Sequence, residues 1–128
     1  MTDTDIYRET LLDIIKSPSN KGSLTDATVE AVEKNPMCGD IMKMQIKIAN
    51  DKIAEIAFDG DACAVGVAAA SLLTEELKGK SVVEAAKFTK QQLLGLIGIQ
   101  LTTSRVKCAT LALDVLASAL KKYEKSQS

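Results

Sequence analysis

The chain has 128 residues, 46% of them hydrophobic, with 16 basic and 17 acidic side chains and no histidine. This length and apolar content suit one domain with a buried core, so we expect residues 1–128 to form a single domain. The near balance of charge, without a long run of one sign, argues against binding to nucleic acid or to an anionic membrane.

The cellular compartment is indicated by the apolar runs and the cysteines. The longest apolar run, residues 62–73, is interrupted and too short to span a bilayer, and the start "MTDTDIYRET" does not look like a signal peptide. We therefore expect a cytoplasmic protein. Thiols stay reduced there, so three cysteines, an odd number, favour ligation or chemistry over a disulfide framework.

The first half of the chain predicts one helix and three strands. Apolar residues at helical spacing predict an amphipathic helix that ends at "SPSNKG", residues 17–22. The apolar residues of this helix are Ile6, Leu11, Leu12, Ile14 and Ile15. Apolar and polar side chains alternate, as they do in half-buried strands, over residues 27–33, 42–48 and 53–58. In the third of these strands, Ala54, Ile56 and Phe58 are expected on one side. The short linkers "KNPMCGD" and "AND" join them into an antiparallel meander.

The second half predicts helices. Residues 63–77 are apolar almost all round, which is typical of a helix buried against a sheet. Ser81 and Glu84 fit a capping box at a helix start. Residues 89–98 predict a short helix and residues 106–123 a long amphipathic helix, and only the last residues, "KSQS", are expected to be frayed. The expected class is α+β, with a three-stranded antiparallel meander packed against about five helices.

The predicted topology brings two of the three cysteines together. In a meander, the first loop and the exit from the third strand lie at the same end of the sheet, so Cys38 and Cys63 should be neighbours. Cys63 and Cys108 are each expected in the first turn of a helix, where the helix dipole favours thiolate. Arg105 and Lys107 would favour the thiolate of Cys108 further. Whether Cys108 joins the other two depends on the packing of the last helix, which the sequence leaves open.

If they converge, Cys38, Cys63, Cys108 and Asp40 form a four-ligand set for zinc or for the iron of an iron–sulfur cluster. A carboxylate binds such iron less tightly than a fourth thiolate, so the cluster would be easier to release. Gly39, which has no side chain, would permit close backbone approach and unusual torsions.

Each of these residues also has a purely structural interpretation. Cys63 inside an apolar helix could be a small core residue, and Asp40 could bond its own turn backbone. Arg105 and Lys107 could be ordinary solvated charges. We expect Met42 and Met44 in the core, and Ser71 in helix packing.

Several motifs in order resemble those of one family. They are "YRETLLDIIKSPSNKG", "NPMCGDIMKMQIKI" with Cys38 and Asp40, "IAFDGDACAVGVAAASLLTEELKGKSVVEA" with Cys63, and "RVKCATLALDVL" with Cys108. Together they resemble the U-type iron–sulfur cluster assembly scaffolds, the IscU, SufU and NifU amino-terminal-domain family. The resemblance implies a SufE/NifU-like α+β fold, with a cluster or zinc site at one end made by the three cysteines and the aspartate. It also implies docking to a pyridoxal-phosphate cysteine desulfurase that delivers sulfur as persulfide.

The sequence departs from each branch of that family at one place. IscU-type chains have a histidine before the third cysteine, in a stretch read by a chaperone; this chain has "LTTSRVKC" there. SufU-type chains, which resemble zinc-dependent sulfur acceptors, have Arg-x-Lys-Cys-Ala as here but also an insertion before it. Cys63 and Cys108 are only 45 residues apart, the shorter, scaffold-like spacing.

The resulting expectation is a scaffold that assembles a [2Fe–2S] cluster on Cys38, Asp40, Cys63 and Cys108 and transfers it to apo iron–sulfur proteins or carriers. Cys108 is the predicted first persulfide acceptor and Cys38 the rival. The alternatives are a SufU-like zinc sulfurtransferase, in which zinc holds the acceptor thiolate, and a metal-free adaptor with buried cysteines. Two or more subunits could share a cluster in a homo-oligomer.

Overall fold

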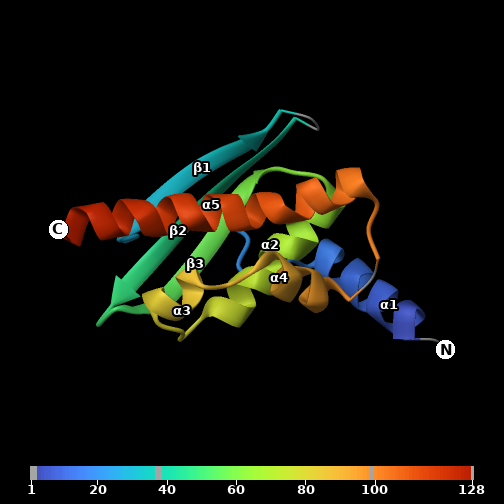
Figure 1. The fold of residues 1–128 in the computed structure, drawn as a ribbon, viewed down its shortest axis with the longest axis horizontal. Helices are drawn as coiled ribbons and strands as arrows, with labels where there is room; N and C mark the ends of the chain where they lie inside the picture. Colours follow the sequence, from blue (N-terminus) through green and yellow to red (C-terminus); the bar gives the residue numbers. More distant parts are fainter. Residues whose placement is uncertain (1–2, 37–38, 99, 128) are drawn as a thin grey trace.

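The computed structural model describes residues 3–36, 39–98 and 100–127 (Figure 1). These residues form five helices and one three-stranded sheet, which confirms the predicted α+β class. In chain order the elements are α1 (Asp3–Lys16), β1 (Val29–Asn35), β2 (Asp40–Ala49), β3 (Lys52–Asp61), α2 (Ala64–Leu77), α3 (Val82–Ala86), α4 (Lys90–Ile97) and α5 (Thr103–Gln127).

The sheet is the predicted antiparallel meander, in the order β1-β2-β3. The first hairpin closes at the Asn35–Asp40 pair and the second at the Ala49–Lys52 pair. Asn50 and Asp51 between them both have positive φ, 54° and 60°. Two left-handed residues form the tight turn whose twist matches that of the strands it joins.

One prediction for the third strand is wrong. Ala54 is exposed, whereas its neighbour Ile53 is buried together with Ile56 and Phe58. The pairing shifts between Lys47 and Ile48, so β3 carries one extra residue opposite this point of β2. Such a bulge reverses the alternation of side chains, and strict alternation therefore assigned Ala54 to the wrong face.

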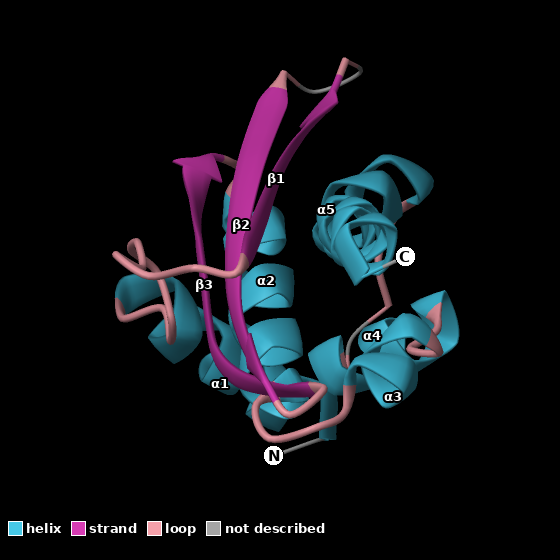
Figure 2. Cartoon of the chain, turned by 90° about the vertical axis from the view of Figure 1, so that its left-hand side faces the viewer, coloured by secondary structure: helices cyan, strands magenta, loops and turns pink. Residues whose placement is uncertain are grey.

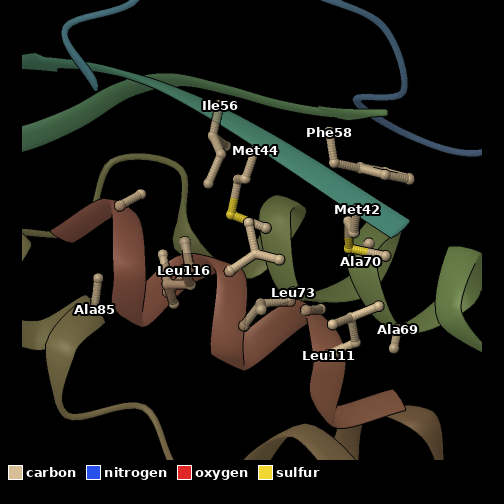
Figure 3. Close-up of a cluster of buried hydrophobic side chains, with 14 of the residues drawn as sticks. Met42, Met44, Ile56, Phe58, Ala69, Ala70, Leu73, Ala85, Leu111 and Leu116 are labelled. Atoms are coloured by element: carbon tan, nitrogen blue, oxygen red, sulfur yellow. The ribbon is translucent and has the colours of Figure 1, made fainter. Parts of the chain in front are cut away.

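The main core lies between the sheet and helices α2 and α5, which cover one of its faces (Figure 2). Met42 and Met44 project from β2 toward Leu73 of α2 and Leu111 of α5, as Figure 3 shows, and both methionines are fully buried as predicted. Alanines at 68, 69 and 70 are buried in α2. Their small side chains allow α2 to pack closely against its neighbours.

The other face and one edge of the sheet are covered by the segment after α1. Gln45 exchanges hydrogen bonds with the backbone of Leu24, its Oε1 accepting at 2.9 Å and its Nε2 donating at 3.3 Å. Phe58 of β3 likewise exchanges backbone hydrogen bonds with Asn20 and Gly22. In α1, Leu11 packs on the core but Leu12 is exposed, contrary to the predicted apolar face.

Helix ends agree with the sequence in α3 and α4 and differ in α5. Ser81 with Glu84, and Thr89 with Gln92, form complete capping boxes. α5 begins at Thr103, before its apolar periodicity starts, because Thr102 accepts the backbone N–H of Val106. Cys108 is therefore in the second turn, not the first. The helix also continues to Gln127, where frayed residues were expected.

Within these described ranges, no helix is both long and apolar enough to cross a membrane.

Candidate metal centre

Three of the four predicted ligands meet at one end of the sheet. One carboxylate oxygen of Asp40 and the Sγ atoms of Cys63 and Cys108 all lie within 4.8 Å of one another. Asp40 is the first residue of β2, Cys63 is the N-cap residue of α2, and Cys108 lies on α5. In the part of the chain that the structure describes, this is the one group of three or more cysteine and acidic side chains close enough to share a metal ion.

The packing of α5, which the sequence left open, decides this convergence. Helices α2 and α5 both begin at the end of the sheet where β2 starts and β3 finishes (Figure 1). Cys63 is half-buried and Cys108 is buried, with 3% of its surface exposed. A cysteine that merely filled the core would not need a carboxylate beside it, so the arrangement favours ligation over the core interpretation of Cys63.

Asp40 connects two elements of the site. Its side chain is buried, with 6% exposed, and its Oδ2 accepts the backbone N–H of Cys63 at 3.1 Å. The alternative, an aspartate that bonds only its own turn, does not describe this contact, which links residues 23 positions apart. The bond holds Cys63 beside β2. The second oxygen, and the second lone pair of Oδ2, remain chemically suited to a metal ion.

Two glycines that the sequence reasoning passed over shape the site. A side chain on Gly60, whose φ is 136°, would overlap the carbonyl oxygen of Ile41, so only glycine allows β3 to lie this close to the start of β2. A Cβ on Gly66 would lie 3.5 Å from the carbonyl oxygen of Cys108 and 3.6 Å from Oδ2 of Asp40. Gly66 follows Cys63 by one helical turn, a spacing that could have indicated its place in the site.

The loop between β1 and β2 carries the remaining predicted ligand. Gly39 has a φ of 75° and donates its N–H to the carbonyl oxygen of Asn35 at 2.8 Å, so the unusual torsion predicted for it is present. No atom lies within 4 Å of the place where its Cβ would be. Cys38 lies outside the described residues, and its predicted part in the site stays a prediction.

Arg105 and Lys107 are both exposed. Lys107 borders a groove of about 190 Å³ whose other walls are Lys34, Asn35, Pro36, Thr110, Leu111 and Asp114. Burial, and secondarily the charge of Glu33, raises the pKa of Asp114 from its ordinary value. Exposure of the two basic side chains agrees with ordinary solvated charges, so any influence on Cys108 remains a proposal.

The donor set fits a thiophilic metal. Two sulfur atoms and one carboxylate oxygen are the ligand types found on zinc and on iron–sulfur clusters, whereas calcium and magnesium prefer oxygen alone. Three donors leave at least one coordination position for a further ligand. The site is therefore suited to a metal ion or cluster that can also be approached from outside.

Comparison with known proteins finds one matching family model and several relatives by sequence. The family model described as "NifU-like N terminal domain" matches residues 6–128. The chain is 34% identical over 118 residues to the iron-sulfur cluster assembly scaffold protein IscU 1 of Archaeoglobus fulgidus, covering 92% of this chain and 76% of that one. It is 30% identical over 136 residues to the zinc-dependent sulfurtransferase SufU of Bacillus subtilis, covering 93% and 92%.

A solved structure agrees with these sequence matches. The crystal structure described as that of a "putative iron-sulfur cluster assembly scaffold protein for SUF system" from Fervidobacterium islandicum superposes with a TM-score of 0.76 at 26% identity, covering 93% of this chain and 99% of that one. The chain belongs to the NifU-like N-terminal domain family, the U-type iron–sulfur scaffold family that its cysteine motifs resemble.

Proposed function

We propose that the protein is a scaffold on which a [2Fe–2S] cluster is assembled and from which it is transferred. The observation that carries the proposal is the convergence of Asp40, Cys63 and Cys108 from three separate elements. Membership of a family with several IscU-named relatives supports the same function. Cys38 is the proposed fourth ligand, because it stands two residues before Asp40 in the loop that the Asn35–Asp40 pair closes.

The cluster is cargo, and the chain supplies ligands and a shielded position for it. Cys108 and Asp40 are buried while Cys63 is half-buried, so one side of the site is closed by protein. Each sulfane sulfur delivered as persulfide gains two electrons to become sulfide, so the two sulfurs of a [2Fe–2S] cluster need four. Two ferrous ions that become ferric supply two of these electrons, and an external reductant, such as a dithiol, supplies the other two. A cysteine desulfurase is the proposed sulfur donor and apo iron–sulfur proteins are the proposed recipients.

Burial bears on which cysteine receives sulfur first. Attack on a donor persulfide requires an accessible thiolate, and Cys108, the predicted acceptor, is only 3% exposed. If Cys108 is the acceptor, the site has to open when the donor docks. If Cys38 is, no such opening of Cys108 is required. Mass spectrometry of persulfidated Cys38→Ser and Cys108→Ser variants distinguishes them, because the variant that lacks the acceptor carries no sulfane sulfur after brief exposure to the desulfurase.

Asp40 is proposed to keep the cluster transferable. A carboxylate is a harder ligand than thiolate and holds cluster iron less tightly. An Asp40→Ala variant should then form a cluster but pass it on slowly, as followed by the visible spectrum of an apo-ferredoxin recipient. Transfer at the wild-type rate would remove this role from Asp40.

The test of the whole proposal is anaerobic reconstitution with ferrous iron, cysteine, a cysteine desulfurase and dithiothreitol, followed by iron, sulfide and zinc analysis and Mössbauer spectroscopy. Equal amounts of bound iron and sulfide, transferable to an apo-ferredoxin, are expected. Retained zinc, no cluster and a faster desulfurase would instead support the second candidate function, a zinc-dependent sulfurtransferase.

That second candidate rests on two observations. The stretch Arg105 to Ala109 has the pattern that precedes the third cysteine in SufU-type chains, and a SufU from Bacillus subtilis is a 30% identical relative. Against it, the alignment with that relative spans 136 positions, more than this chain possesses, so the relative contains residues that are missing here. The scaffold is therefore the proposal that we favour.

A further inference from the structure

The outer edge of β1 offers backbone groups to a further strand. β1 is an edge strand because the sheet order is β1-β2-β3. The Nζ of Lys122 donates to the carbonyl oxygen of Glu30 at 3.1 Å, so the backbone of Glu30 points away from β2. Backbone groups alternate sides along a strand, so those of Val32 and Lys34 point outward as well. Among the described residues, no hydrogen bond is recorded for these outward groups of Val32.

The other edge of the sheet is treated differently. Asn20 and Gly22 pair with Phe58 of β3, and Gly79 and Lys80 pair with Ile53. The chain thus covers the β3 edge with its own backbone at two places. At the β1 edge it leaves Val32 with 51% of its surface exposed, an apolar side chain in the middle of an edge strand.

A cationic groove runs beside this exposed edge. Its volume is about 260 Å³, and it is lined by Ala31, Val32, Glu33, Ser118, Lys121, Lys122 and Lys125. The acidic side chains of β1 have partners of their own: Glu33 accepts from the hydroxyl of Ser118, and Glu30 pairs with Lys43 at 3.6 Å and accepts from Gln45. The groove contains three lysines and one carboxylate, that of Glu33, so positive charge dominates the surface presented to a ligand that lies along β1.

We propose that the β1 edge and the lysines at 121, 122 and 125 form a docking surface for an extended, acidic segment of a partner protein. Such a segment would pair its backbone with Val32 and Lys34 and direct alternate carboxylates toward α5. Charge complementarity selects this occupant over a second copy of the chain. In a β1–β1 dimer each groove would face a strand whose two glutamates, Glu30 and Glu33, are already hydrogen-bonded to Gln45 and Ser118. That strand also carries Lys34 at the edge, so it offers few available carboxylates to the lysines of another copy.

The lysine-lined part of the proposed surface is separate from the candidate metal centre, whereas its Lys34 end lies next to the Asn35–Asp40 pair. Lys121 follows Cys108 by thirteen residues on the same helix, which corresponds to about 20 Å along its axis at about 1.5 Å per residue. A partner held at these lysines would leave the half-buried Cys63 open to approach by a donor or recipient. The proposal does not depend on the proposed scaffold function, and its test uses no metal.

The test measures binding of a short dye-labelled peptide of alternating glutamate and valine to the full chain by fluorescence anisotropy, with a lysine–valine peptide as the sign control. Amide shifts in ¹H–¹⁵N spectra locate the bound peptide. A Lys121→Gln/Lys125→Gln variant removes two charges from the groove. A Lys87→Gln/Lys90→Gln variant removes two exposed charges near α3 and α4 and serves as the matched control.

We expect the acidic peptide alone to bind, with the largest shifts at Val32 and Lys34. The groove variant should bind about three- to tenfold more weakly, and the control variant within about twofold of wild type, as expected for partly exposed ion pairs. Equal weakening in both variants, shifts centred elsewhere, binding of both peptides alike, or no binding would overturn the proposal. So would a dimer in sedimentation whose Val32 and Lys34 amide signals shift when it is diluted to the monomer.

Discussion

The two ends of the sheet differ in the kind of group that they bring together. We call the cluster of Asp40, Cys63 and Cys108 the ligand end, and the turn at residues 50–53 with residues 79–82 the far end. At the far end, Ile53 pairs with Gly79 and Lys80, and Val82 donates to Asp51 at 2.8 Å, so backbone groups satisfy one another. At the ligand end a buried carboxylate and two thiols face each other within 4.8 Å.

This difference confines the expected metal binding to one end of the sheet. Backbone pairing at the far end ties the second hairpin to the start of α3 and requires nothing further. At the ligand end the side chains gathered together are ones that prefer a metal ion to each other, since neighbouring thiols and a carboxylate form weak contacts without one. Changes at the ligand end should therefore alter metal binding, and changes at the far end should alter folding alone.

The largest effect on metal binding is expected from Cys63→Ser. Loss of residues that only orient metal ligands already costs about 10–100-fold in affinity, so loss of a ligand should reduce retained iron by at least about tenfold. Iron and sulfide per chain after reconstitution and desalting measure this. Cys63 is half-buried, so the variant should still fold. A far-end variant, Tyr123→Phe, should keep its iron. Wild-type iron content in Cys63→Ser would remove the distinction between the two ends.

The next effect compares two glycines, one at each end. Gly60→Ala should lower the free energy of unfolding by about 3 kcal/mol or more, because its Cβ would overlap the Ile41 carbonyl in a backbone region that favours glycine. Gly79 has a φ of 82° with no atom within 4 Å of its missing Cβ. Gly79→Ala should therefore cost only about 1–2 kcal/mol.

Urea unfolding of the metal-free proteins measures both glycine variants. Equal losses would show that the close approach of β3 to Ile41 contributes nothing beyond the positive φ.

A smaller effect is expected from Asp40 in the absence of metal. Asp40→Ala removes the acceptor of the Cys63 N–H and should lower the free energy of unfolding by about 1 kcal/mol. Asp40→Asn keeps an oxygen at that position and should recover most of this loss. Thermal unfolding at neutral pH compares the two. If the asparagine variant is no more stable than the alanine variant, the hydrogen bond to Cys63 does not support the site.

The smallest effect is expected at the far end. Tyr123 donates its hydroxyl to Asp51 at 3.1 Å, and burial, with this bond as a secondary cause, raises the pKa of the tyrosine above 10. Tyr123→Phe should slightly lower the unfolding temperature. Because the pKa is raised in the folded state, the neutral Tyr123 hydroxyl stabilises the fold fully below pH 10. This stabilisation is lost as the pH rises through the folded-state pKa.

The unfolding temperatures of the wild type and of Tyr123→Phe should therefore converge in strongly alkaline solution. Unfolding temperatures measured from pH 8 upward test this, and a constant difference at all pH values would contradict it.

Local patterns in the sequence predicted most of the elements, because each depends on neighbours in the chain. Alternation identified three strands, "AND" identified the tight turn at Asn50 and Asp51, and Ser81 with Glu84 identified a capped helix start. The same local reasoning failed where a single backbone irregularity changed the pattern. One extra residue in β3 moved Ala54 outward, and a start at Thr103 placed Cys108 one turn deeper in α5.

What the sequence by itself determined is the chemistry of the site: which residues can bind a thiophilic metal, and that the first loop of the meander, which carries Cys38 and Asp40, lies at the same end as Cys63. The tertiary structure alone decided that Cys108 joins them, because only the packing of α5 on the sheet sets where that helix begins relative to α2. It also decided that β1 keeps an open, lysine-lined edge. Both depend on contacts between residues far apart in the chain, for which periodicity and spacing contain no signal.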